Sequence, residues 1–130
     1  MTAAHPAAEV LVVDAANVVG SRPTGWWRDR GGAARNLVAQ VRAAARDGRI
    51  DPPVVVVLEG RARGGVPAGE ADGVDVVQAP GAGDDTIVDV VSAAIDHAVT
   101  VVSADRGLAA RVRERGAAVV GPRWLNERVF

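Results

Sequence analysis

The sequence predicts an α/β fold: a three-layer α/β/α sandwich around a parallel sheet, with residues 1–130 forming a single domain. Short runs of β-branched and apolar residues, such as Val10–Val13 and Val54–Leu58, lack polar alternation, as expected of strands that are covered on both faces. Segments with helical periodicity lie between those runs. Strands that alternate with helices form parallel sheets with right-handed crossovers, which gives the sandwich.

Each element follows from a local pattern. The first strand ends abruptly at Asp14, and the next segment, residues 21–32, is rich in Pro and Gly and indicates a loop. Residues 33–47 have apolar side chains at helical spacing and end at Gly48, a typical stop. After the second strand, Arg61–Gly73 holds four glycines and a proline without periodicity, and we expect a long mobile loop. The remaining expected elements are a strand at 74–77, a helix from Asp84 to about His97, a strand at 99–103, a helix at 106–115, a strand at 117–120 and a terminal helix or tail at 122–130.

Composition excludes several classes of protein. The chain has no cysteine, so disulfides, thiolate metal sites and cysteine nucleophiles are absent. A net charge of −1 argues against a general nucleic-acid coat protein. Residues 1–8 lack a signal-peptide pattern, and no apolar run approaches the roughly 18 residues of a membrane span. We therefore expect a cytoplasmic protein with no membrane partner.

Acidic residues gather where the predicted strands end. Asp14, Glu59 and Asp105 lie at or just beyond the carboxyl ends of strands, and Asp84 and Asp85 open the helix after the third strand. Ligands of open α/β sheets bind outside this edge. Carboxylate oxygens are the preferred ligands of Mg²⁺ and Mn²⁺, and two such ions could activate water and stabilise the leaving oxygen of a phosphodiester. The pattern indicates metal-dependent phosphoryl chemistry.

Each acid also has a structural alternative. Asp105 could be a helix N-cap, and Asp84 and Asp85 could complement the helix dipole in a first turn. Asp14 could fix a turn through its side chain, and Glu59 could be a solvated loop residue. Periodicity separates the two adjacent aspartates: Asp84 shares the apolar stripe of its helix, whereas Asp85 shares the polar one, so Asp84 is the better ligand candidate.

Three motifs in this order resemble the PIN-like nucleases: VVDAANVV at 12–19, GDDTIV at 83–88 and VSADRGL at 102–108. The resemblance covers about residues 10–120 and is strongest to the NYN branch, which includes the group named for the bacterial YacP protein. It implies a parallel sheet ordered 3-2-1-4-5, Mg²⁺ or Mn²⁺ at the acidic edge, and cleavage of RNA. Asp14, Asn17, Asp84 and Asp105 match the family's acidic and amide positions, whereas Glu59 stands where relatives often carry an aspartate.

The segment around Trp26 and Trp27 is not part of that general pattern. Two indoles close to Arg28 and Arg30 could stack on unpaired bases and hold phosphates. Alternatively, the tryptophans could be hydrophobic lids over the end of the sheet. Arg106, next to Asp105, could bind a phosphate or pair with a neighbouring acid.

The sequence thus predicts a ribonuclease that uses Mg²⁺ or Mn²⁺ and a metal-activated water. Asp14, Asp84 and Asp105 would hold metal, Asp85 and Glu59 would assist, and Asn17 would orient a ligand or contact the scissile phosphate. The alternatives are a non-catalytic PIN-like module that binds RNA or protein, and a nucleotide pyrophosphohydrolase. The expected partner is single-stranded or structured RNA, and a homodimer and a protein regulator are left open.

Overall fold

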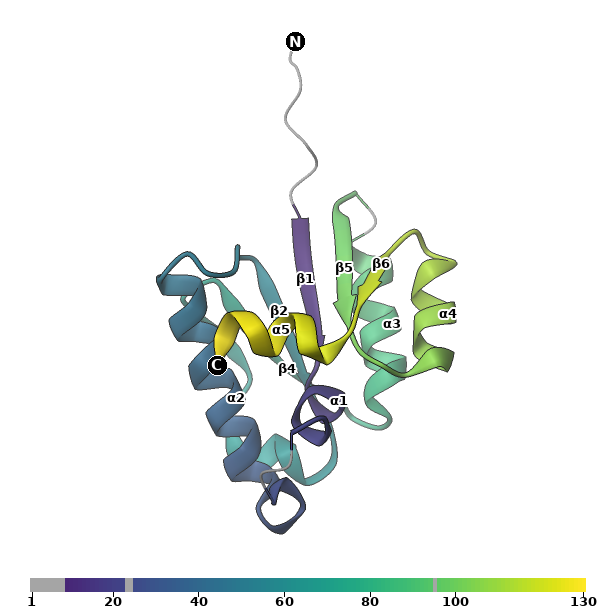
Figure 1. Cartoon of the computed structure of the whole chain (residues 1–130). Coiled ribbons are helices and arrows are strands. Elements are labelled where there is room, and N and C mark those ends of the chain that lie inside the picture. Colours follow the sequence, from purple (N-terminus) through teal and green to yellow (C-terminus); the bar gives the residue numbers. More distant parts are fainter. Residues whose placement is uncertain (1–8, 23–24, 95) are drawn as a thin grey trace.

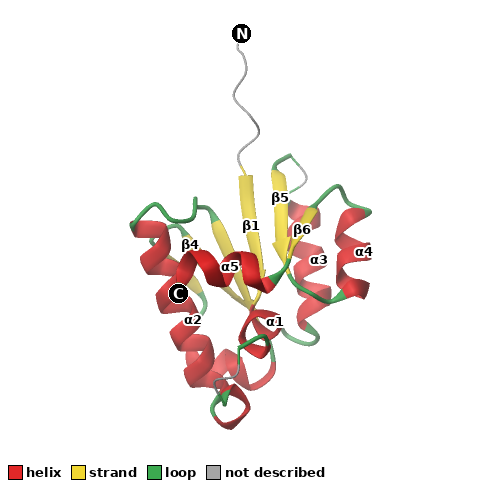
Figure 2. Ribbon diagram, in the orientation of Figure 1, coloured by secondary structure: helices red, strands yellow, loops and turns green. Residues whose placement is uncertain are grey.

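The computed structural model describes residues 9–22, 25–94 and 96–130, which form one sheet with helices on both faces (Figures 1 and 2). The elements, in chain order, are β1 (Glu9–Asp14), α1 (Ala15–Gly20), the 3₁₀ turn η1 (Trp26–Arg28), α2 (Arg30–Arg46), β2 (Val54–Leu58), the 3₁₀ turn η2 (Gly60–Gly65), β3 (Gly69–Ala71), β4 (Val74–Gln78), α3 (Gly83–Ala93), β5 (Ala98–Val102), α4 (Arg106–Arg113), β6 (Ala118–Val120) and α5 (Pro122–Val129).

The sheet has the order β3-β4-β2-β1-β5-β6. All pairs are parallel except β3 with β4. The five parallel strands are the five that the sequence predicts, and their spatial order confirms the expected 3-2-1-4-5. The sixth strand, β3, was not predicted. Since β1 lies at the centre, its carboxyl end is flanked by the ends of β2 and β5.

Two apolar layers enclose the sheet. Alternate residues of β1 face opposite sides: Leu11 and Val13 pack with buried residues of α1, α2 and α5, whereas Val10 and Val12 pack with those of α3 and α4. Figure 1 shows α2 and α5 on one face of the sheet and α3 and α4 on the other. The three-layer prediction is therefore confirmed, and the uninterrupted valine runs follow from burial on both faces.

The segment Arg61–Gly73 is not the long loop that the sequence predicts. Its first part forms η2, and its last part forms β3, which makes a hairpin with β4. Two turn residues join the hairpin strands, Asp72 with φ 57° and Gly73 with φ 78°. A two-residue turn with both φ angles positive matches the twist of the strands, and Asp-Gly is a preferred sequence for it. The glycine content reflects tight turns and close packing.

Other boundaries also differ from the prediction. A short helix, α1, directly follows β1, and α2 begins at Arg30 because Asp29 caps it: the Asp29 carboxylate accepts a 2.8 Å hydrogen bond from the Gly32 N–H. Helix α3 ends at Ala93, earlier than the expected His97. No helix in the described residues has the length and apolar character needed to cross a membrane.

Candidate active site

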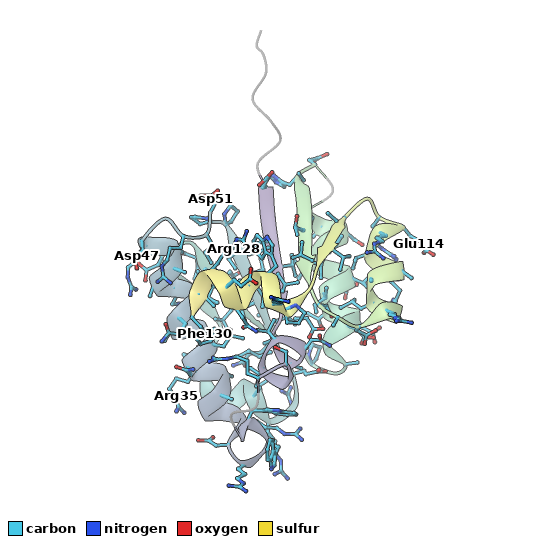
Figure 3. The ribbon with its side chains drawn as sticks, viewed as in Figure 1. Arg35, Asp47, Asp51, Glu114, Arg128 and Phe130 are labelled. Atoms are coloured by element: carbon cyan, nitrogen blue, oxygen red, sulfur yellow. The ribbon has the colours of Figure 1, made fainter. Side chains whose placement is uncertain are left out.

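The carboxyl ends of β1, β2 and β5 meet at one edge of the sheet, which we call the acidic rim and define by Asp14, Glu59, Asp84, Asp85 and Asp105. Asp14 is the last residue of β1, Glu59 follows β2, and Asp105 lies between β5 and α4. Asp84 and Asp85 lie in the first turn of α3. Asp51, labelled in Figure 3, precedes β2 and so lies at the opposite end of that strand from Glu59.

Asp14 is the half-buried member of the rim on the central strand. Its Oδ2 accepts a 2.8 Å hydrogen bond from the Ser103 hydroxyl, and its Oδ1 accepts a 3.4 Å bond from the Asn17 N–H. Burial raises the pKa of the Asp14 carboxyl above its ordinary value; the two hydrogen bonds oppose this rise, and repulsion from Glu59 and Asp105 adds to it. A carboxylate held in this way would gain stability from a neighbouring cation.

A chain of hydrogen bonds connects Asp14 to the loop after β5. Ser103 is only 3% exposed, yet both of its hydrogen-bonding functions are used, since its hydroxyl oxygen also accepts a 3.1 Å bond from the Asp105 N–H. The Asn17 side-chain oxygen accepts a 2.7 Å bond from the Ala104 N–H. Asp105 in turn caps α4 by accepting from the Leu108 N–H at 3.0 Å. Asp14, Asn17 and Asp105 are therefore brought together as one network.

Glu59 is fixed by a different helix. Its Oε2 accepts a 2.6 Å hydrogen bond from the N–H of Gly83, the first residue of α3. A Cβ atom at position 83 would lie 3.0 Å from the Glu59 Cδ and Oε2 atoms, so glycine allows the carboxylate to approach the helix end. Glu59 is consequently a structural contact of α3 rather than a solvated loop residue. The repulsion that it exerts on Asp14 places it beside the network.

Asp84 and Asp85 pair with a residue that the sequence did not single out. Arg111, on α4, lies with its Nη1 atom 3.5 Å from Asp84 Oδ2 and 3.0 Å from Asp85 Oδ1. The two side chains are 42% and 67% exposed, so Asp84 is the more buried, as its position on the apolar stripe of α3 predicts. Ile95, which the sequence assigns to the same stripe, lies outside the described residues.

The rim has the donor chemistry of a Mg²⁺ or Mn²⁺ site but not a finished set of ligands. Within residues 9–22, 25–94 and 96–130, no three acidic or histidine side chains converge closely enough to hold a metal ion by themselves. Mg²⁺ commonly keeps several waters and binds proteins through one or two carboxylates together with substrate phosphates. Asp14 and Asp105, which lie close enough to repel each other, fit that mode of binding.

Trp26 and Arg30 line one pocket together with Glu59 of the rim, and Trp27 and Arg28 lie next to Trp26 in η1. The Trp26 and Trp27 rings make an edge-to-face pair with centroids 6.2 Å apart. The Arg30 guanidinium carbon lies 5.4 Å from the Trp26 ring, and that of Arg28 lies 5.8 Å from the Trp27 ring. In the part of the chain that the structure describes, neither arginine forms an ion pair with a carboxylate, and neither does Arg106.

Comparison with solved structures identifies the fold. The chain superposes on Rae1 (YacP) from Bacillus subtilis with a TM-score of 0.71 and 21% identity, over 92% of this chain and 72% of that one. A tryptophan-to-leucine mutant of the same protein gives a TM-score of 0.71 and 20% identity, over 93% and 74%. The chain has the YacP fold. No protein-family model matches the sequence, and no curated protein matches it either.

The YacP fold agrees with the group that the three sequence motifs resemble, although the motifs did not point to every residue of the rim. Ser103 stands within the VSADRGL motif as the one polar residue at the end of a buried strand, which is a signal that could have identified it. Arg111 gives no such signal, because its contacts with Asp84 and Asp85 join two different helices.

Proposed function

We propose that this chain is a metal-dependent ribonuclease that hydrolyses RNA phosphodiester bonds at the acidic rim. The observation that carries the proposal is Asp14, a half-buried carboxylate at the end of the central strand, crowded by Glu59 and Asp105 on a chain with the YacP fold. Crowded like charges are a cost in the metal-free protein, and a divalent cation would offset it.

Asp14 and Asp105 would hold Mg²⁺ or Mn²⁺, and Asp84, Asp85 and Glu59 would assist; the ion would supply Lewis-acid chemistry for activating water and stabilising a leaving oxygen. Ser103 holds the Asp14 carboxylate in one orientation by its 2.8 Å hydrogen bond. Asn17 fixes the loop after β5 through Ala104, so the amide positions Asp105 relative to Asp14. This makes Asn17 a positioning residue whose side-chain NH₂ group can still donate to a phosphate.

The substrate must bring negative charge to an acidic surface, and two features of the rim favour this. The amino-terminal ends of α3 and α4 lie at the rim, and the positive ends of helix dipoles attract phosphate groups. Arg30 shares a pocket with Glu59, Arg106 directly follows Asp105, and Arg28 lies near the Trp27 ring. These three arginines have no carboxylate partners in the described residues, and guanidinium groups suit phosphate recognition. A chain of phosphodiesters can contact both sets of groups at once.

The experiment is a cleavage assay with end-labelled single-stranded RNA and Mn²⁺. We expect cutting by the wild type, none in EDTA, and none by Asp14→Asn, which keeps the shape and capping ability of the side chain but removes its charge. Asp89→Asn is the matched control, since Asp89 is an exposed carboxylate on α3 away from the first turn, and it should cut normally. Unchanged cleavage in EDTA would exclude metal-dependent hydrolysis.

A second candidate is an RNA-binding module without catalysis. The observation that favours it is Arg111, whose guanidinium already neutralises Asp84 and Asp85 where a metal ion would otherwise do so. Under this alternative, calorimetry would detect RNA binding with no Mn²⁺ binding, and Asp14→Asn would bind RNA at least as tightly as the wild type.

A further inference from the structure

A pocket of about 380 Å³ opens beside the acidic rim. Its walls come from α1, η1, α2 and η2, together with Glu59 between β2 and η2 and Gly81 before α3. They include Val19, Trp26, Arg30 and Ala62. We propose that this pocket receives one unpaired nucleobase of the RNA, stacked on Trp26, and so sets where the strand lies relative to Asp14. The inference rests on the proposed function and adds a specific subsite to it.

The two tryptophans have different environments, and Trp26 is the one that lines the pocket. Trp26 lines the pocket and is partly buried, and its indole ring lies close to Gly20, where an added Cβ atom would be 3.7 Å from Cζ2. Trp27 is 56% exposed and meets Trp26 at an interplanar angle of 87°. Trp27 therefore packs beside Trp26, and Trp26 is the ring that a base in the pocket would meet.

The charged groups of the pocket complement a nucleotide better than an apolar ligand. Arg30 lies over the Trp26 ring and has no carboxylate partner in the described residues, so its guanidinium can bind a phosphate. Glu59 uses Oε2 to accept from Gly83, and its other oxygen can accept an N–H from the pairing edge of a base. Every RNA base carries such a donor, but only an unpaired base can offer it.

The pocket is connected to the rim through the same glutamate. Glu59 lines the pocket and also follows β2 directly, the strand whose Val57 pairs with Asp14 of β1. A base held against Trp26 and Glu59 would consequently place its adjoining phosphodiester next to the carboxylates. This geometry selects single-stranded or bulged RNA, since a base within a duplex cannot enter.

The wall formed by η2 is held in place before any ligand binds. Arg63 donates to the carbonyl oxygens of Gly60 at 3.1 Å and Ala79 at 3.2 Å. Gln78 donates to those of Arg63 at 2.8 Å and Val66 at 2.7 Å. Because these bonds fix the turn to β4 and to the segment that follows it, the pocket needs little reorganisation to accept a base, which favours affinity.

The test is an abasic scan of RNA binding, measured by fluorescence anisotropy in EDTA so that no cleavage occurs. A labelled six-nucleotide RNA is compared with versions in which one nucleotide in turn lacks its base. We expect one position to lose affinity strongly, by about 5- to 140-fold, the range that corresponds to one lost stacking contact. Trp26→Ala should weaken binding of the intact RNA by a similar factor. Removing the base at that position should then cause no further loss of affinity in Trp26→Ala, because both changes remove the same contact.

Trp27→Ala is the matched control, and it should change affinity less while keeping the response to the abasic position. Trp26→Phe retains an aromatic ring and should restore much of the binding, which separates stacking from loss of folding. A flat abasic scan, or equal losses for the two alanine variants at every position, would overturn the pocket. A flat scan with intact Mn²⁺-dependent cleavage refutes only the subsite, whereas a positive scan without cleavage refutes only the nuclease.

Discussion

The packing of η2 against α2, two elements that both line the pocket, depends on Gly65. A Cβ atom at this position would lie 2.6 Å from the Gly31 carbonyl carbon and 2.7 Å from its Cα, and it would overlap the carbonyl oxygen. All three atoms belong to the backbone, so no side-chain rotation relieves the clash. Overpacking of this kind costs about 1–3 kcal/mol. For a chain of this length, that loss corresponds to a fall in melting temperature of roughly 3–15 °C.

The assay is thermal unfolding of Gly65→Ala followed by circular dichroism, with Gly64→Ala as its neighbouring control. At Gly64 an added Cβ would have no heavy atom within 4 Å, so alanine there should be neutral or stabilise by about 0.4–1 kcal/mol through the unfolded state. Gly65→Ala should also weaken RNA binding, because η2 must move away from α2. Equal melting temperatures for the two variants would refute the inferred close packing.

Three further predictions concern the rim. The pKa of Asp14 is raised in the folded state, so the folded protein holds this proton more tightly than the unfolded protein does. The stability in EDTA should therefore fall as the pH rises from the ordinary pKa range of aspartate through the raised pKa. A plot of melting temperature against pH should show this fall for the wild type, and Asp14→Asn should remove it. Ser103→Ala leaves the Asp14 carboxylate and the Asp105 N–H without their shared partner and should cost about 1–3 kcal/mol in chemical denaturation. Arg111→Gln breaks only exposed ion pairs and should change the free energy of unfolding by less than about 1 kcal/mol. It should nevertheless tighten Mn²⁺ binding in calorimetry, because a competing cation is removed from Asp84. An unchanged Mn²⁺ affinity would show that the guanidinium does not compete.

The sequence predicts the central part of the sheet well because burial on both faces leaves a simple pattern. Valine runs mark β1, β2 and β5, and each ends at the polar residue that begins the next turn. The β3 strand was missed because Gly69–Ala71 has little strand propensity and exists by pairing with β4. The dipeptide Asp72–Gly73 was nevertheless a readable hairpin signal.

Local rules fail where distant segments decide the outcome. Arg30 to Gly32 carries two glycines and looks like a loop, yet it forms the first turn of α2, because Asp29 caps it. The backbone of Gly31 lies so close to η2 that Gly65 has no room for a Cβ atom. Likewise, parallel topology predicts that Asp14, Glu59 and Asp105 meet at one edge. It does not predict that Arg111 pairs with Asp84, since that contact depends on how two helices pack.

The two outermost strands of the sheet, β3 and β6, span only three residues each. Another chain can add a strand to a sheet by pairing with the free N–H and C=O groups of an edge strand, and short edge strands offer few of these groups. Without β3, the edge strand would be β4, which has five residues and includes the buried Val74 and Val76. The hairpin thus replaces a five-residue edge with a three-residue one, which disfavours the addition of a strand from another chain at this side of the sheet.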